Sequence, residues 1–376
     1  MAFLGISEFK HFVGVVEDRF DPQKLGRLRV RVLGVHTSDK NKIATADLPW
    51  ASVVLPTTAA GISGLGQSPS FIVEGAWVWG YFRDGDSLMQ EMVIVGTLPG
   101  KPAELGNTDS GFYDPNFRLD ADGQPTTISV YPKEMAEPDT NRLAVNDPEK
   151  PHSSLGARAT NRFINQNIPT ADFDEVGSNI AASDTDNWSQ PAITYNAVYP
   201  YNHVFESESG HIKEYDDSFT VDEDGIRTNH YRIYERHSSG TSYEIDTAGN
   251  RIDLNMASYF NITNKDNKHY IKGNSDVTID GRHKVYINKS GIENNNYDIQ
   301  VGPNANVNIQ VDNGNLNVVT KTGQFNFDVG SDFNCNVGGN YNLNVQGSET
   351  KTVEGTTTHN TTGSTTIRGS TIDLNP

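Results

Sequence analysis

The C-terminal part of this sequence carries an eight-residue repeat, which limits the possible folds more than any other feature. Glycines recur at intervals of eight residues, and they are Gly339, Gly347, Gly355 and Gly363. A valine or a threonine stands two positions before each glycine, namely Val337, Val345, Val353 and Thr361. A short internal period of this kind indicates a repetitive architecture in which each unit packs against other units.

Apolar and polar residues alternate within each repeat. The apolar positions are Phe325, Phe327, Val329, Phe333, Cys335, Val337, Tyr341, Leu343 and Val345. Asparagines such as Asn326 and Asn334 stand between them. Because eight is even and strand side chains alternate with a period of two, one face of the chain stays apolar through the whole run. A glycine at each corner would allow a positive φ or the close approach of a neighbouring backbone.

Each repeat is too short to bury its own apolar face. Two architectures would bury it: one chain coiled into a β-helix, or three chains wound into a triangular prism with one strand per chain on each face. Single-chain β-helices usually have longer coils or hexapeptide units. The eight-residue period therefore favours an intertwined triple-stranded β-helix over residues 271–376, in a homotrimer, although repeat length alone leaves both architectures open.

The composition fits a thin core and excludes several classes of protein. The chain has 30 Lys+Arg and 48 Asp+Glu, a formal charge of −18, and 35% hydrophobic residues. This acidic balance argues against binding nucleic acid through its phosphates. No apolar run approaches the roughly 18 residues of a membrane-spanning helix, and the apolar N-terminal stretch is too short for a signal peptide. A single cysteine permits neither an internal disulfide nor a cysteine zinc site, so we expect assembly in a reducing cytoplasm.

Residues 1–105 have the pattern of a small all-β domain. Five strand-like segments begin at His11, Arg27, Trp50, Ala76 and Glu91. Clusters of glycine, proline and aspartate separate them, as expected for turns. Five short strands of this spacing predict a five-stranded Greek-key barrel of the OB type.

The middle of the chain divides into two further segments. Residues 106–195 are polar and rich in proline, and they show neither helical nor strand periodicity, which predicts an extended polar linker. Residues 196–270 regain strand patterns and are expected to lead into the repeats. The predicted fold class is therefore all-β along the whole chain.

Two separate blocks of sequence resemble the central spike, or cell-puncturing, proteins of contractile-tailed bacteriophages. The block HFVGVVEDRFDPQKLGRLRVRVLGVH, which starts at His11, resembles the N-terminal OB domain of that family. The block YPYNHVFESESGHIKEYDD, which starts at Tyr199, resembles the start of the family's triple-stranded β-helix. The segment YRIYERHSSGTSYEID and the Val-x-Gly octads resemble the β-helix itself.

The resemblance implies a homotrimeric structural protein of the virion, in the tail baseplate. Its OB domains would dock on a trimeric hub protein, a separate chain because the OB domain begins close to Met1. The β-helix would carry a PAAR-type tip protein and pierce the host outer membrane when the sheath contracts. A VgrG-type spike of a secretion or injection particle shares this plan and stays open as an alternative.

The resemblance also reveals a departure from the family pattern. A well-known relative inserts a lysozyme domain between barrel and β-helix, whereas residues 106–195 here lack a fold that could hold the paired carboxylates of a glycosidase. We therefore expect no catalytic residues, no bound cofactor or metal, and no enzymatic activity. A tailspike that degrades polysaccharide is a further alternative, disfavoured because octads form a narrow prism without an acidic groove.

Several residues have both a functional and a structural interpretation. His359 has the parity of the apolar face, so three copies could hold an ion on the trimer axis. A polar core layer is the simpler interpretation of His359. Glu349 and Lys351 share that parity and would have to pair with one another.

Two more segments have docking as one interpretation. The final apolar positions reverse the parity of Ile367, which predicts a tip-docking end containing Thr371, Ile372 and Leu374. Trp77, Trp79 and Tyr81 lie on one face of a strand. We expect that face to form barrel core rather than a docking surface.

Overall fold

The computed structural model divides the chain into two units, Met1–Gly281 and Arg282–Pro376. The residues that the structure describes are 10–85, 88–103, 107, 109–119, 121–122, 125–129, 131, 136–152, 154, 195–275, 277, 279, 281–288, 291 and 296–373. Among them, strands account for nearly all regular structure, and the exceptions are the 3-10 turn η1 (Thr45–Asp47), the single-turn helix α1 (Arg142–Val145) and the helical residue Ser154. The predicted all-β class is confirmed.

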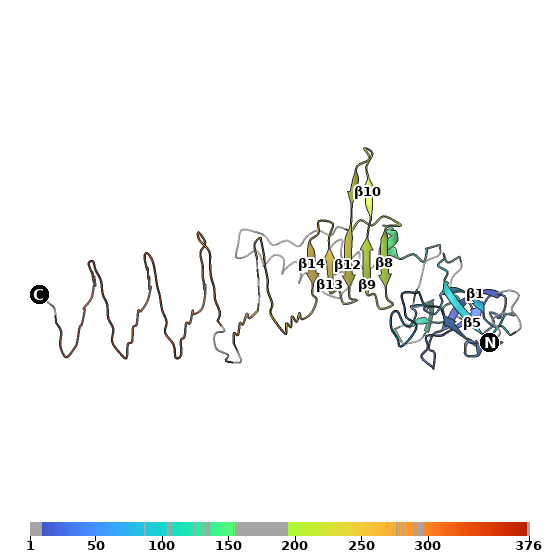
Figure 1. The fold of residues 1–376 in the computed structure, drawn as a ribbon, viewed down its shortest axis with the longest axis horizontal. Helices are drawn as coiled ribbons and strands as arrows, with labels where there is room; N and C mark the ends of the chain where they lie inside the picture. Colours follow the sequence, from blue (N-terminus) through green and yellow to red (C-terminus); the bar gives the residue numbers. More distant parts are fainter. Residues whose placement is uncertain are drawn as a thin grey trace. The chain divides into compact units, whose positions relative to one another are not determined.

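The first strands of the chain form a closed five-stranded barrel (Figure 1). They are β1 (Lys10–Asp18), β2 (Leu28–Val32), β3 (Trp50–Val53), β4 (Trp77–Phe82) and β5 (Met92–Thr97). The strand order is β1-β2-β3-β5-β4, with every neighbouring pair antiparallel except β3 and β5. The N-terminal barrel predicted from the sequence is confirmed.

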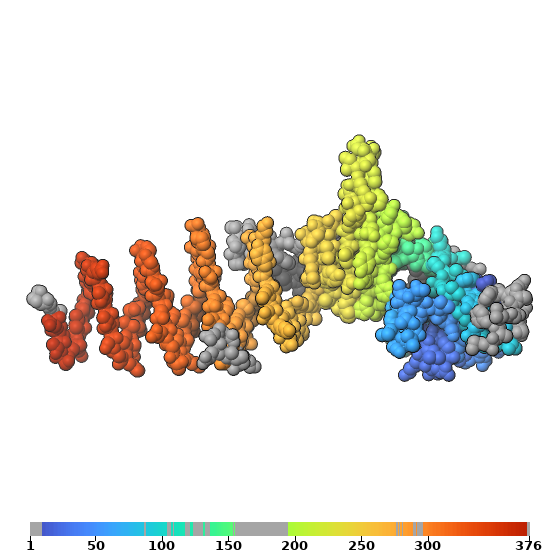
Figure 2. Space-filling view, in the orientation of Figure 1, coloured from blue at the N-terminus to red at the C-terminus, as the bar shows by residue number. Residues whose placement is uncertain are grey.

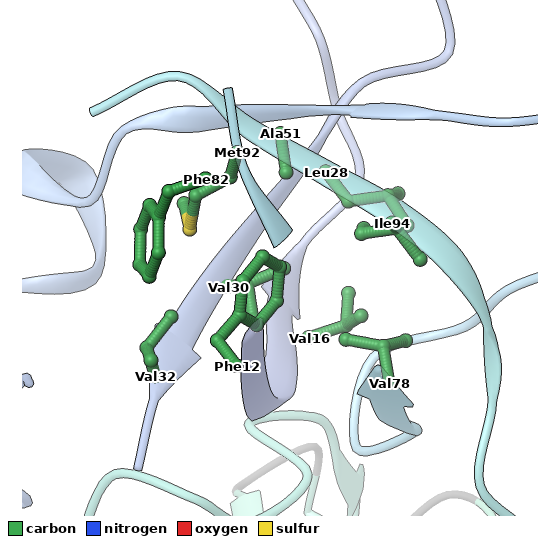
Figure 3. Packing of buried hydrophobic residues seen from close by; sticks show 10 residues of the cluster. All are labelled: Phe12, Val16, Leu28, Val30, Val32, Ala51, Val78, Phe82, Met92 and Ile94. Carbon is green, nitrogen blue, oxygen red and sulfur yellow. The ribbon is translucent and has the colours of Figure 1, made fainter. Parts of the chain in front are cut away.

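Apolar side chains from all five strands fill the barrel (Figure 3). The buried cluster comprises Phe12, Val16, Leu28, Val30, Val32, Ala51, Val78, Phe82, Met92 and Ile94. The rings of Phe12 and Phe82 lie 5.1 Å apart, and Phe12 fits against Gly80 because that residue lacks a Cβ. Burial of a large apolar side chain contributes about 1.5–3 kcal/mol, so one copy of the barrel supplies its own stabilising core.

The tryptophan-rich face of β4 differs from the prediction. Val78, Gly80 and Phe82 point into the barrel, whereas Trp77 and Trp79 are exposed. The expectation that the tryptophan face is core was wrong. The two faces of β4 are both apolar, so alternation alone does not reveal which one is inside.

A buried ion pair fastens the connection between β2 and β3 to the barrel. The side chains of Glu17 and Arg31 are fully buried, with 2.6 Å between Arg31 Nε and Glu17 Oε1. Arg31 also donates to the backbone carbonyls of Thr37 and Ile43 at 2.7 and 2.8 Å. Thr45 Oγ1 donates to Glu17 at 2.8 Å. Removing two charges from water costs free energy, and the attraction within a buried ion pair offsets that cost only when additional hydrogen bonds of this kind are present.

The predicted linker is not extended throughout. Within its described residues, β6 (Phe117–Leu119) pairs with β7 (Pro125–Ser129), and α1 follows. Leu143 of α1 is buried against the next sheet. A single anchoring residue of this kind leaves no periodic signal in the sequence. The rest of the linker prediction, residues 155–194 above all, lies outside the described residues.

A five-stranded antiparallel sheet follows in the segment where strands were expected (Figure 1). Its strands are β8 (Asn202–Glu206), β9 (Ile212–Asp216), β12 (Arg232–Arg236), β13 (Ser242–Ile245) and β14 (Arg251–Leu254). Their order is β14-β13-β12-β9-β8. The connection from β9 to β12 is a hairpin of β10 (Phe219–Val221) and β11 (Arg227–Asn229), which projects from the sheet in Figure 1.

The C-terminal unit has a different character. Its described residues contain no strand paired with another strand of the same chain. The chain runs as a sawtooth in Figure 1, and Figure 2 shows successive legs standing apart (orange to red). The backbone bends at 330–331, 338–339, 346–347, 354–355 and 362–363, which is once every eight residues.

The corner glycines correct one expectation. Gly339, Gly347, Gly355 and Gly363 do not have a positive φ, and no other atom of this chain comes within 4 Å of where their Cβ would lie. The positive-φ explanation was therefore wrong for the isolated chain. Close approach of a neighbouring backbone stays a prediction, which concerns other copies of the chain.

Candidate assembly surfaces

The apolar side chains of the repeats contact one another along one side of the sawtooth. The rings of Phe325 and Phe327 lie 4.7 Å apart. Phe327 and Phe333 stand on opposite sides of a bend, and their rings still lie 5.9 Å apart. Across the bend at 362–363, Thr361 Oγ1 and Thr365 Oγ1 are 3.2 Å apart. Side chains of the same parity thus stay on the same side after a bend, as the even repeat requires.

This apolar face is open to solvent in the single chain. Phe333 is 67% exposed and Tyr341 is 70% exposed. The other predicted core positions are exposed as well: Phe325, Phe327, Val329, Cys335, Val337, Leu343, Val345 and Val353. Soluble monomers rarely expose contiguous apolar surface on this scale. The face is therefore a surface that requires a partner.

The remaining predicted positions of the C-terminal unit have varied outcomes. Glu349, Lys351 and His359 are exposed in the single chain. No group of three or more His, Cys, Asp or Glu that could hold a metal ion occurs in the described part of the chain. An ion at His359 would need three copies and stays a prediction. At the tip, Thr371 and Ile372 are exposed, whereas Leu374 lies outside the described residues.

The outer face of the barrel is a second exposed apolar surface. Trp79 is 37% exposed, and the ring of His11 on β1 stacks on it with the centroids 5.3 Å apart. Trp77 of β4 and Val95 of β5 are exposed as well, so this surface extends over β1, β4 and β5. The sequence revealed the aromatic row, but it did not reveal that the row faces outward.

A cluster of polar groups lies where the barrel contacts the sheet. Arg19 forms two hydrogen bonds with the carboxylate of Glu208. Its Nε also lies 3.1 Å from Glu74 Oε2, and Tyr131 Oη donates to Glu208. This cluster leaves no signal in the sequence, because its members are far apart in the chain and belong to no motif.

A serine, a histidine and a glutamate are aligned as in a hydrolase, but their burial argues against catalysis. His152 Nδ1 lies 2.7 Å from Ser154 Oγ, and His152 Nε2 lies 3.0 Å from both oxygens of Glu206. The Ser154 backbone N–H also donates to Nδ1, so this nitrogen is the acceptor and the ring proton is assigned to Nε2. Ser154 is only 2% exposed, so its hydroxyl cannot meet a substrate.

The array instead anchors the segment before residue 155 to β8. Asn141 Nδ2 donates to Glu206 at 2.6 Å, on the same carboxylate that His152 contacts. Burial raises the pKa of Glu206, but the hydrogen bonds with His152 and Asn141 lower it below its ordinary value. The ionised carboxylate is thus the form that the contacts favour.

Comparison with known proteins defines the class of this chain. Residues 34–188 match the family model described as Gp5 N-terminal OB domain. The chain is 34% identical over 312 residues to Protein Gp5 of Vibrio phage KVP40, with 76% of this chain and 66% of the relative covered. It is 46% identical over 109 residues to the Pre-baseplate central spike protein Gp5 of Enterobacteria phage T4, with 28% of this chain and 19% of that protein covered.

The chain is therefore similar to phage proteins, one of which is named a pre-baseplate central spike protein. The chain belongs to the Gp5 central spike proteins of contractile-tailed phages. The family membership and the virion baseplate location predicted from the sequence are confirmed. The chain spans 66% of the length of the KVP40 relative and 19% of the T4 relative. No helix among the described residues is long and apolar enough to cross a membrane.

Proposed function

We propose that three copies of this chain wind into a central spike that pierces the host outer membrane during sheath contraction. In this assembly, residues 271–376 form the triple-stranded β-helix, and the barrels dock on a ring-shaped hub. The spike acts mechanically and carries no catalytic site.

The observation that carries the proposal is the uncovered apolar face of the C-terminal unit. The backbone bends every eight residues, so no described segment of the unit pairs with another. Within the described residues of this unit, one copy therefore provides neither strand pairing for the backbone nor burial for the apolar side chains. Two further copies, displaced around the same axis, would satisfy both needs at once.

The order of residue types supports this arrangement. In a three-start prism, each strand lies between strands of the other two copies that are one repeat earlier and one repeat later. Residues eight apart then become neighbours on a face. Each set of residues spaced by eight contains side chains of one kind. The aromatic set is Phe325, Phe333 and Tyr341, the valine set is Val329, Val337, Val345 and Val353, and the asparagine set, on the outer face, is Asn326, Asn334 and Asn342. Stacked like residues are typical of paired repeats.

The exposed barrel face supports docking on the hub. Trp77, Trp79 and His11 offer aromatic surface that is exposed in the described part of the chain. Aromatic residues are enriched at the centres of protein interfaces. We assign the tip-docking role to residues 370–376, and deleting them should abolish tip-protein binding while leaving the trimer intact.

The absence of an enzymatic role is part of the proposal. The triad-like array places its serine hydroxyl out of reach of a substrate, which supports a structural role. A muramidase assay on purified full-length protein tests this point. We expect no turnover, and turnover that persists through repeated purification would contradict it.

Gel electrophoresis of samples that are not boiled tests the assembly. We expect a band at about three times the chain mass of 41.3 kDa that converts to the single chain on heating. Thin intertwined rods should resist detergent because separating the copies requires unwinding them. A single-chain band without heating would contradict the proposal.

A further inference from the structure

One carboxylate brings together three distant segments of the chain. Glu208 lies in the turn between β8 and β9, and it accepts hydrogen bonds from Arg19 Nη1 and Nη2 at 2.7 and 2.6 Å. Tyr131, which follows β7, donates to the same carboxylate. Nearby, the ring of Phe71 meets the ring of Phe205 edge-on, with the centroids 4.8 Å apart. The barrel therefore contacts the sheet through both polar and aromatic groups.

Arg19 compensates a second carboxylate at the same place. Its Nε lies 3.1 Å from Glu74 Oε2, and the side chain of Glu74 is only 2% exposed. Without the guanidinium, this buried carboxylate would lack its cation. Isolated surface ion pairs contribute little, but a bidentate pair that shares its cation with a buried acid is a stronger arrangement.

We propose that the Arg19–Glu208 pair is a joint that fixes the barrel against the β8–β9 end of the sheet. The joint prevents bending of the chain between β5 and β8. The idea that it passes contraction force to the rod rests on the proposed function, whereas the joint itself does not.

The joint should persist in mild acid. The hydrogen bonds from Arg19 and then Tyr131 lower the pKa of Glu208 to about 2 from an ordinary value of 4.5. A carboxylate whose pKa is lowered on folding stabilises the folded form above its ordinary pKa, and this contribution is lost as the pH falls through the lowered value. The contact is therefore complete at neutral pH and weakens only as the pH falls from about 4.5 towards 2.

The two partners of the pair should not be equivalent when they are neutralised. Glu208→Gln keeps an acceptor for Arg19 and leaves Glu74 compensated. Arg19→Gln leaves the carboxylates of Glu74 and Glu208 without the guanidinium that they share. Arg83→Gln is the matched control, because Arg83 pairs with Glu91 at 2.8 Å on the exposed surface of the barrel alone.

Thiol crosslinking measures how often the joint is closed. Phe71→Cys and Phe205→Cys are introduced together into the full chain carrying Cys335→Ser, and the rate at which a short bismaleimide joins the two thiols is followed, because contact of the two rings brings both positions within reach of such a reagent without requiring disulfide geometry. We expect closure about tenfold slower with Arg19→Gln, the size expected for losing charge-assisted hydrogen bonds. Glu208→Gln should slow closure by a smaller factor of about three, because it removes the charge but keeps an acceptor for Arg19, whereas Arg83→Gln should change the rate less than about twofold.

Two outcomes would overturn the joint: no closure in the parent, or closure as fast with Arg19→Gln as without it. Light scattering on the same samples reports the number of copies. If the protein is a monomer but its joint closes at the parent rate, the proposed trimeric spike is contradicted and the proposed joint is still supported.

Discussion

The barrel and the C-terminal unit have similar alternating apolar patterns with opposite results. The barrel strands close on one another, so Val30, Val78 and Ile94 are fully buried within one copy. The segments between the bends of the repeats also carry Phe, Tyr and Val at alternate positions, yet one copy leaves these side chains exposed. The difference lies in the connections. The barrel's turns bring strands back to their neighbours, whereas a bend every eight residues carries the chain onward.

The largest expected effect comes from a charge on the apolar face of the repeats. Phe333→Asp would place one carboxylate per copy near the axis, and each uncompensated buried charge costs about 3–5 kcal/mol. We expect complete loss of the heat-sensitive oligomer on gels, while tryptophan fluorescence shows an intact barrel.

Asn334→Asp is the matched control for that substitution. The residue lies one position further on, on the opposite face of the strand. It should assemble normally. Equal loss of assembly in both variants would contradict the assignment of the two faces.

The reverse experiment damages the barrel and spares the repeats. Arg31→Met removes the partner of the fully buried Glu17, which should lower barrel stability by about 3–5 kcal/mol. Urea unfolding followed by tryptophan fluorescence measures this effect, because Trp50, Trp77 and Trp79 lie in the barrel. A loss below about 1 kcal/mol, as for exposed pairs, would contradict the role given to the pair.

A smaller effect distinguishes contacts within one copy from contacts between copies. At Gly80, a Cβ would meet the Phe12 ring and a carbonyl of β5, so Gly80→Ala should cost about 1–3 kcal/mol in the barrel. At Gly347, a Cβ would meet no atom of the same chain. Any loss of oligomer stability from Gly347→Ala, measured by thermal dissociation, therefore reports close approach of another copy. An unchanged dissociation temperature would contradict a close approach of another copy at Gly347.

The smallest effect is a pH dependence confined to the barrel. Burial raises the pKa of Glu17, but hydrogen bonds from Arg31 and Thr45 hold it below its ordinary value of 4.5. The carboxylate therefore stabilises the barrel above about pH 4.5, and this contribution is lost as the pH falls through the lowered value. The barrel's melting temperature should fall in that range, and Glu17→Gln should flatten the dependence. A slope unchanged by Glu17→Gln would assign the effect to other carboxylates.

Features that recur along the chain could be predicted from the sequence, whereas contacts made by single residues could not. Alternation and spacing were sufficient to predict the five barrel strands and the eight-residue bends, because those signals recur along the chain. The outward position of Trp79 was missed because both faces of β4 are apolar. The Arg19–Glu208 contact was missed because its partners stand 189 positions apart. The partner of the apolar face of the repeats follows from the period only as a prediction, because one copy contains none of its contacts.

The thiol of Cys335 provides the most direct test of the central claim that other copies cover the apolar face. It is the single cysteine of the chain, it has the parity of that face, and it is exposed in one copy. We expect a soluble thiol reagent to leave native full-length protein unlabelled and to label it fully after denaturation. Labelling of the native protein at the rate of a free cysteine would contradict the account.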